Sequence, residues 1–138
     1  MFDPSKDLDR IHKLVIEDSE ILTLMGLSNA EDAAKAKSIL KRDAWDDLIG
    51  NTKRINIYYR PSRTNRNEII FTEIIQIDVH VPAVEDYQAY KIQKRLNQLI
   101  HRYKSDTRIF HFDGQVGGIA TMPGFFCIGS RYKFHIVN

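Results

Sequence analysis

Two short stretches of the sequence combine histidine and carboxylate side chains at a spacing that could support chemistry. Asp78-Val79-His80 and His111-Phe112-Asp113 each place a carboxylate and an imidazole two residues apart, on the same face of a strand. Such oxygen and nitrogen ligands suit a divalent cation. The spacing supplies no third ligand, and polar residues are usual on the open face of antiparallel strands. We interpret both pairs as solvent-face residues and expect no metal site and no cofactor.

Two catalytic classes can be tested against the residues. A nuclease would gather two carboxylates and a lysine on neighbouring strands, but Glu73 and Asp78 lie on opposite faces and no Glu-x-Lys follows them. Nucleophilic catalysis would need an activated thiolate, and Cys127 follows Phe126 in the middle of a strand pattern, where a packed thiol is expected. The sequence therefore predicts a protein that is not an enzyme.

A glycine-rich span from Gly114 to Gly124 could be mistaken for a phosphate-binding loop. The Walker pattern ends in Gly-Lys-Ser/Thr at the start of a helix, whereas Pro123-Gly124 leads into a strand. We expect a mobile hairpin loop from Asp113 to Gly124. A loop of about twelve residues without structure of its own is uncommon and is often functional.

A second polar loop carries three arginines, Arg60, Arg63 and Arg66. They could contact phosphate, but exposed loops are commonly charged for solubility, and three arginines separated by polar residues make a weak basic patch. We interpret this loop as mainly a solvent-exposed one.

The order of secondary-structure elements follows from hydrophobic periodicity. We expect one or two helices from Ser5 to Gly26, with Asp18-Ser19 capping the second, then a helical stretch from Ala30 to Ile49 and a long helix after Pro82. Alternating or β-branched runs predict strands, listed by range: 55–59, 69–81, 108–112 and 126–136. The prediction is an α+β fold of order α-α-β-β-α-β-β, a mostly antiparallel sheet of about four strands with helices packed on one face.

Composition bounds the class of protein. The 138 residues are 43% hydrophobic and 28% charged, which predicts one globular domain over residues 1–138. Twenty basic and eighteen acidic side chains nearly balance, unlike the concentrated basic face of a nucleic-acid binder. The single cysteine excludes an internal disulfide, and no apolar stretch approaches the eighteen or so residues that span a bilayer. We expect a protein made in a cytoplasm, with no membrane partner.

The order of elements and three stretches of sequence resemble the tail-completion, tail-terminator and tail-to-head joining proteins of long-tailed phages. These stretches are the helical Ile11 to Gly26, the strand-to-helix passage Ile74 to Tyr90 and the terminal Ser130 to Val137. They are patterns of packed positions rather than catalytic signatures, and the resemblance covers most of the chain.

The resemblance implies a structural subunit of the virion, made in the cytoplasm of a host bacterium. It implies a ring of six copies at the head-tail interface, contacting the tail tube protein and the head connector or stopper protein, with DNA passing through the lumen. The two polar loops would then hold the partner contacts: Arg60, Arg63, Arg66, Gln115, Val116, Ile119 and Met122.

Two other classes stay open. A nucleic-acid-binding accessory protein would use the arginine loop and the basic residues of the long helix, Lys91, Lys94, Arg95, Arg102 and Lys104. A small metal-dependent hydrolase would use Asp78, His80, His111 and Asp113 and would bind a divalent ion stoichiometrically.

Overall fold

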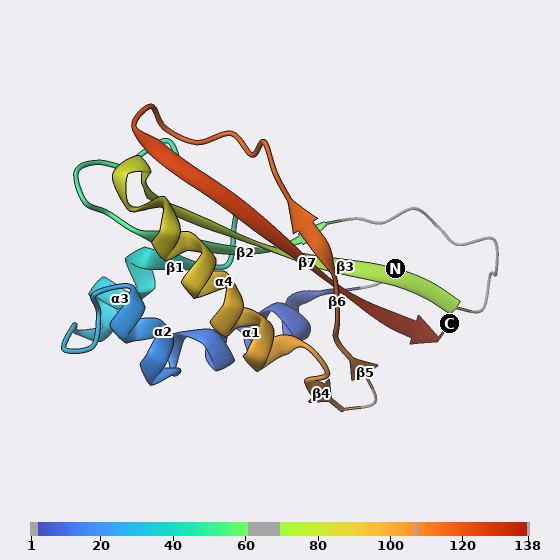
Figure 1. Ribbon diagram of the computed structural model, residues 1–138. Coiled ribbons are helices and arrows are strands. Elements are labelled where there is room, and N and C mark those ends of the chain that lie inside the picture. Colours follow the sequence, from blue (N-terminus) through green and yellow to red (C-terminus); the bar gives the residue numbers. More distant parts are fainter. Residues whose placement is uncertain (1–2, 61–69, 107, 138) are drawn as a thin grey trace.

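The computed structural model describes residues 3–60, 70–106 and 108–137, and it has the mixed α+β architecture that the periodicity predicts (Figure 1). The helices are α1 (Ser5–Ile16), α2 (Ser19–Leu24), α3 (Asp32–Ser38), the 3-10 helix η1 (Ala83–Glu85) and α4 (Asp86–Ile100). The strands are β1 (Ile39–Leu40), β2 (Arg54–Arg60), β3 (Ile70–Pro82), β4 (Lys104–Ser105), β5 (Arg108–Ile109), β6 (His111–Val116) and β7 (Phe125–Val137).

A mostly antiparallel sheet forms the centre of the molecule, in the order β1-β2-β3-β7-β6. The long strands β3 and β7 pair along their whole length, from Ile70 opposite Val137 to Pro82 opposite Phe125. Among the described strands, β1 alone runs parallel to its neighbour. A separate hairpin of β4 and β5 follows α4.

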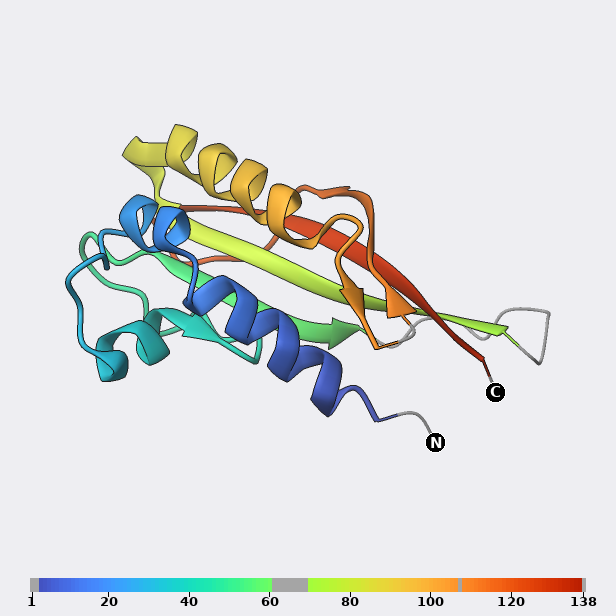
Figure 2. The ribbon, with the colours of Figure 1, turned by 90° about the horizontal axis from the view of Figure 1, so that it is seen from below.

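Helices α1, α2 and α4 cover one face of this sheet (Figure 2). The period-two residues of β3, among them Ile75, Ile77 and Val79, point toward the helices and are buried. The apolar stripe of α4, including Ile92 and Leu96, packs against these strand residues. The core therefore lies between the sheet and these helices.

An ion pair holds the second and fourth helices together. Asp18 caps α2 by accepting a hydrogen bond from the backbone N–H of Ile21 at 3.0 Å, as the sequence predicts. Its carboxylate also accepts hydrogen bonds from Nε and Nη2 of Arg95 on α4, at 3.0 and 2.7 Å.

The longest of the described helices is α4, with 15 residues. No helix in the described part of the chain is long and apolar enough to cross a membrane.

The strand count of about four and the predicted order of elements are not confirmed, and the helix expected from Ala30 to Ile49 is limited to α3, Asp32–Ser38. The main sheet has five strands, because Ile39 turns from α3 directly into β1, where it is buried beside Ile55. The helix α3 has no buried residue, so the thin apolar stripe supplies too little burial to extend it through residue 49.

The predicted strand from Arg108 to Phe112 is divided in two. Phe110 leaves the ladder and is fully buried, exchanging backbone hydrogen bonds with Arg102 and Tyr103. The second part continues as β6 to Val116, well into the glycine-rich span. The buried Phe110 therefore separates β5 from β6.

Beyond the reach of the other strands, β3 and β7 continue as a two-stranded ribbon (Figure 1). The pairing of β2 with β3 ends at Arg60 opposite Ile74, and that of β6 with β7 ends at His111 opposite Lys133. The backbone of the ribbon thus spans residues 70–73 and 134–137.

Replacing Arg108 with methionine is expected to lower the free energy of unfolding by about 2 kcal/mol. Arg108 on β5 pairs with Asp7 of α1, whose carboxylate is only 1% exposed, so its loss leaves a buried charge without this guanidinium. Chemical denaturation of both proteins measures the change. Lys41→Met, which removes an exposed pair with Asp9, is the matched control and should change stability by less than about 0.5 kcal/mol. Equal effects would contradict the prediction.

Candidate interaction surface

The face of the sheet away from the helices carries polar side chains that are buried. Asn56, Asp78 and His80 have no exposed surface, and Gln76 is nearly as sheltered. Residues 41–53 provide part of the cover, because the carbonyl of Ala44 accepts hydrogen bonds from Asn56 Nδ2 at 3.0 Å and from Arg54. We call this face the buried polar face.

His80 lies at the centre of the buried polar face. Its Nδ1 is 2.8 Å from Thr121 Oγ1, and its Nε2 is 3.4 Å from Asn56 Nδ2. The Asn56 amide nitrogen can only donate, and the Ala44 carbonyl fixes its orientation, so Nε2 of His80 is the acceptor. The ring proton is then on Nδ1 and is donated to Thr121.

Burial disfavours the charged forms of three titratable groups on this face, His80, Cys127 and Asp78. Desolvation, with a smaller contribution from the positive charge of Arg54, lowers the pKa of His80 to about 4. Burial raises the pKa of the Cys127 thiol and of the Asp78 carboxyl, although Asp78 accepts hydrogen bonds from Tyr58 and Gln76 at 2.6 and 2.8 Å. None of these groups is an activated nucleophile in this arrangement.

The interpretation of Asp78 and His80 as solvent-face residues is wrong, because two segments distant in sequence cover them. The two histidine-carboxylate pairs also stay apart. Asp78 lies opposite Gly129 of β7, whereas His111 lies on the far side of β7 opposite Lys133. Among the described residues, no three histidine, cysteine or acidic side chains gather closely enough to hold a metal ion.

The glycine-rich segment packs onto the buried polar face instead of extending from the fold. Thr121 contacts His80, and an ideal Cβ at Gly129 would lie 2.6 Å from Ile119 Cδ1. Gln115 and Val116, expected in the loop, belong to β6. The loop itself is residues 117–124, and the Met122 carbonyl accepts a hydrogen bond from Phe125 to close it at 3.0 Å. A hairpin is confirmed, but its loop is shorter than predicted.

Of the arginine-loop candidates, the structure places one. Arg60 ends β2, is exposed, and donates through Nη1 to Gln76 Oε1 at 2.8 Å. Arg63 and Arg66 lie outside the described residues. Arg60 thus hydrogen-bonds to strand β3.

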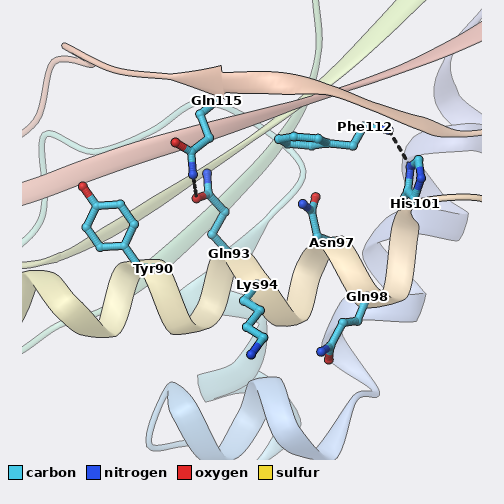
Figure 3. Close-up of a pocket in the computed structure, with 8 residues that line it drawn as sticks. All are labelled: Tyr90, Gln93, Lys94, Asn97, Gln98, His101, Phe112 and Gln115. Atoms are coloured by element: carbon cyan, nitrogen blue, oxygen red, sulfur yellow. Dashed lines mark hydrogen bonds between the residues drawn. The ribbon is translucent and has the colours of Figure 1, made fainter.

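A groove of about 590 Å³ runs between α4 and the edge strand β6 (Figure 3). One wall consists of Tyr90, Gln93, Lys94, Asn97 and Gln98 of α4 and of His101, which directly follows that helix; the other consists of Phe112 and Gln115 of β6. The α4 members recur at helical spacing, so they form one side of the helix. We call this the amide groove.

Two hydrogen bonds fasten the walls of the amide groove to each other. Gln115 Nε2 donates to Gln93 Oε1 at 2.6 Å, and the backbone N–H of Phe112 donates to Nδ1 of His101 at 3.0 Å (Figure 3). Asn97 Oδ1 is occupied as the acceptor of the Tyr132 hydroxyl at 2.6 Å. Hydrogen bonds therefore hold the two walls of the groove in place, and amide, aromatic and cationic side chains line it.

Sequence reasoning identified Gln115 but missed Gln93 and Asn97. Each directly follows a residue of the apolar stripe of α4, a position where an amide usually lies between the core and solvent. The available sequence signal was their spacing of four residues, which places both on one side of the helix; in the structure that side faces β6.

The sheet has two outer edges. The edge at β6 borders the amide groove, and the edge at β1 and β2 lies on the opposite side of the sheet. The strand order leaves the outer side of β6, and of β2 beyond Asn56, without another strand among the residues that the structure describes. Unpaired strand edges are templates for association. The candidate functional surface is therefore made of the two sheet edges and the amide groove.

Comparison with known proteins gives no family for this chain. No family model matches it, and no curated protein matches it. One similar solved structure covers 88% of this chain and 96% of its own, with 12% identical residues and a TM-score of 0.43. A likeness of this degree carries no argument about function.

Proposed function

We propose that this protein is a structural subunit of a phage virion that forms a ring at the head-tail interface. In this role it joins or terminates the tail, contacts the tail tube protein and the head connector or stopper protein, and leaves a lumen for DNA. The ring is proposed to contain six copies.

The observation that carries this proposal is a pair of sheet edges, the outer side of β6 and that of β2 beyond Asn56, that have no strand partner among the described residues. They belong to different strands, β6 and β2, on opposite sides of one sheet. Contacts between two different surfaces of the same subunit are heterologous, and such contacts give a closed ring when the rotation closes. A β3–β7 ribbon beyond the sheet offers a further extended surface for a partner above or below the ring.

The chemistry of the polar residues supports an assembly role over an enzymatic one. Asp78, His80 and Cys127 are buried and hydrogen-bond to neighbours on the sheet and its covering loops. They stabilise the fold where an enzyme would need them open to a substrate.

The test is the mass and shape of the purified protein, alone and with tails of the phage that encodes it. Sedimentation should show assembly on the tails, and negative-stain microscopy should show a ring of density at one tail end. A protein that stays monomeric and leaves the tail ends bare would refute the proposal.

A nucleic-acid-binding accessory function is the second candidate, favoured by exposed Lys91 and Lys94 on α4. Arg95, however, is held by Asp18 and Glu20, so it contributes to helix packing. Binding to duplex DNA that weakens steeply between 50 and 200 mM salt, about a thousandfold for a six-phosphate contact, would favour this class.

A further inference from the structure

We infer that neighbouring copies join by adding the free half of β2 from one copy to the outer edge of β6 on the next, in antiparallel pairing. This inference rests on the proposed ring and names the two surfaces that meet in it. The partner that binds at each edge is a second copy of this chain.

The strand directions favour this pairing. From β2 to β3, β7 and β6 each neighbouring pair is antiparallel, so β2 and β6 run in opposite directions at opposite sides of the sheet. When copies follow one another side by side with their helices on the same face, β6 of one copy meets β2 of the next in antiparallel orientation. The ladder then continues with the geometry that it has inside each subunit.

The lengths of the two free edges agree. The strand β1 pairs with β2 at Ile55 and Asn56, so residues 57–60 have no strand partner on that side within the described part of the chain. On β6 the His101 ring already accepts the backbone N–H of Phe112, which leaves 113–116. Each edge therefore offers four residues.

Opposite charges meet in the register that these lengths allow. Arg60 contacts Gln76 and Asp113 contacts Lys133, which places both side chains on the face away from the helices. Antiparallel pairing with the β6 irregularity between Phe112 and Gln115 retained puts Asp113 across from Arg60 of the neighbouring copy. The Asp113 pair with Lys133 is long, at 3.5 Å, and exposed, so the carboxylate can accept a new partner.

On the helix side of the same ladder, the added strand brings an aromatic residue to the amide groove. Gln115 faces α4, and the residue across from it in this register is Tyr59 of the neighbouring copy. The Tyr59 hydroxyl donates to Glu73 of its own copy, so the part of Tyr59 that meets Phe112 and Gln115 next to that position is its ring.

A charge exchange tests the pairing in the full-length protein. Asp113→Lys and Arg60→Glu should each weaken self-association at least about tenfold in sedimentation velocity, because each sets like charges opposite one another. The double variant should recover most of the affinity. An equimolar mixture of the two single variants should recover it as well, since alternating copies place Lys opposite Glu and Asp opposite Arg. Additive losses in the double variant would overturn the inference.

Disulfide trapping covers the case in which association is too weak to measure without tails. Arg60→Cys with Asp113→Cys should give a ladder of covalent oligomers under mild oxidation at high protein concentration, because cross-strand Cβ atoms lie at disulfide distance. Each single cysteine variant should give no more than dimers, and Cys127 is buried and stays protected. Absence of the ladder overturns the inference. Rings on tails without this ladder would leave the proposed function standing and refute only this interface.

Discussion

Gly129→Ala is expected to destabilise the fold by about 3 kcal/mol, at the upper end of what overpacking costs. An ideal Cβ at this position would lie 2.5 Å from Asp78 Oδ1, 2.6 Å from Ile119 Cδ1 and 3.3 Å from Gln76 Nε2. The methyl group would displace the covering loop and disturb the hydrogen bonds of a buried carboxyl. Equilibrium denaturation in urea measures the loss.

Gly117→Ala is the matched control for this substitution. Gly117 begins the same loop, nothing lies within 4 Å of its Cβ position, and no positive φ angle constrains it. Its variant should be as stable as the parent within about 0.5 kcal/mol. A Gly129→Ala protein with parental stability would show that the loop does not rest against the sheet.

Acidification is expected to destabilise the protein by about 3 kcal/mol through His80. Its pKa is about 4 in the fold against an ordinary value near 6.5. Above pH 6.5 the ring is neutral in both states and costs nothing; as pH falls toward 4, the unfolded chain takes up a proton that the fold excludes. Stability is therefore lost between pH 6.5 and 4. The positive charge of Arg54 is one of the causes of this loss, because it helps to lower the pKa of His80, whereas the raised pKa of Asp78 opposes the loss at the acidic end.

His80→Gln isolates this contribution. The other four histidines and Asp78 remain in the variant, so their titrations largely cancel when the two stability profiles are subtracted. The difference should be level above pH 7 and should shrink as pH falls to 4. Parallel profiles across the whole range would mean that His80 is accessible to protons in the folded state.

The elements with strong periodicity could be predicted from the sequence, and those set by distant contacts could not. Ile75, Ile77 and Val79 alternate clearly, so β3 was placed within one residue of each end. The two residues of β1 carry no pattern of their own, because Ile39 becomes a strand residue only through pairing with Ile55. Local propensity does not contain that partner.

The candidate surface was only partly predictable for the same reason. Alternation showed that Asp78 and His80 share a face, but their burial depends on segments that are distant in sequence. Thr121 contacts His80 from 41 residues away, and the Ala44 carbonyl accepts a hydrogen bond from Asn56 on the same face. Polar alternation is read as solvent exposure unless a second layer is known. Likewise, Gln93 and Gln115 come to face each other across the amide groove only because β6 lies at the sheet edge beside α4.

The continuous pairing of β3 with β7 has a mechanical consequence. When one of these strands is pulled at the ribbon end and the other is held at the opposite end, the ladder from Ile70–Val137 to Pro82–Phe125 is loaded in shear, so many hydrogen bonds resist at once instead of opening in sequence. The end of the ribbon is thus tied through one rigid span to η1 at the opposite end of the sheet, where the Gly124 carbonyl accepts the Ala83 N–H at 2.8 Å. Tension applied at one end of the molecule is transmitted to the other with little stretching between them.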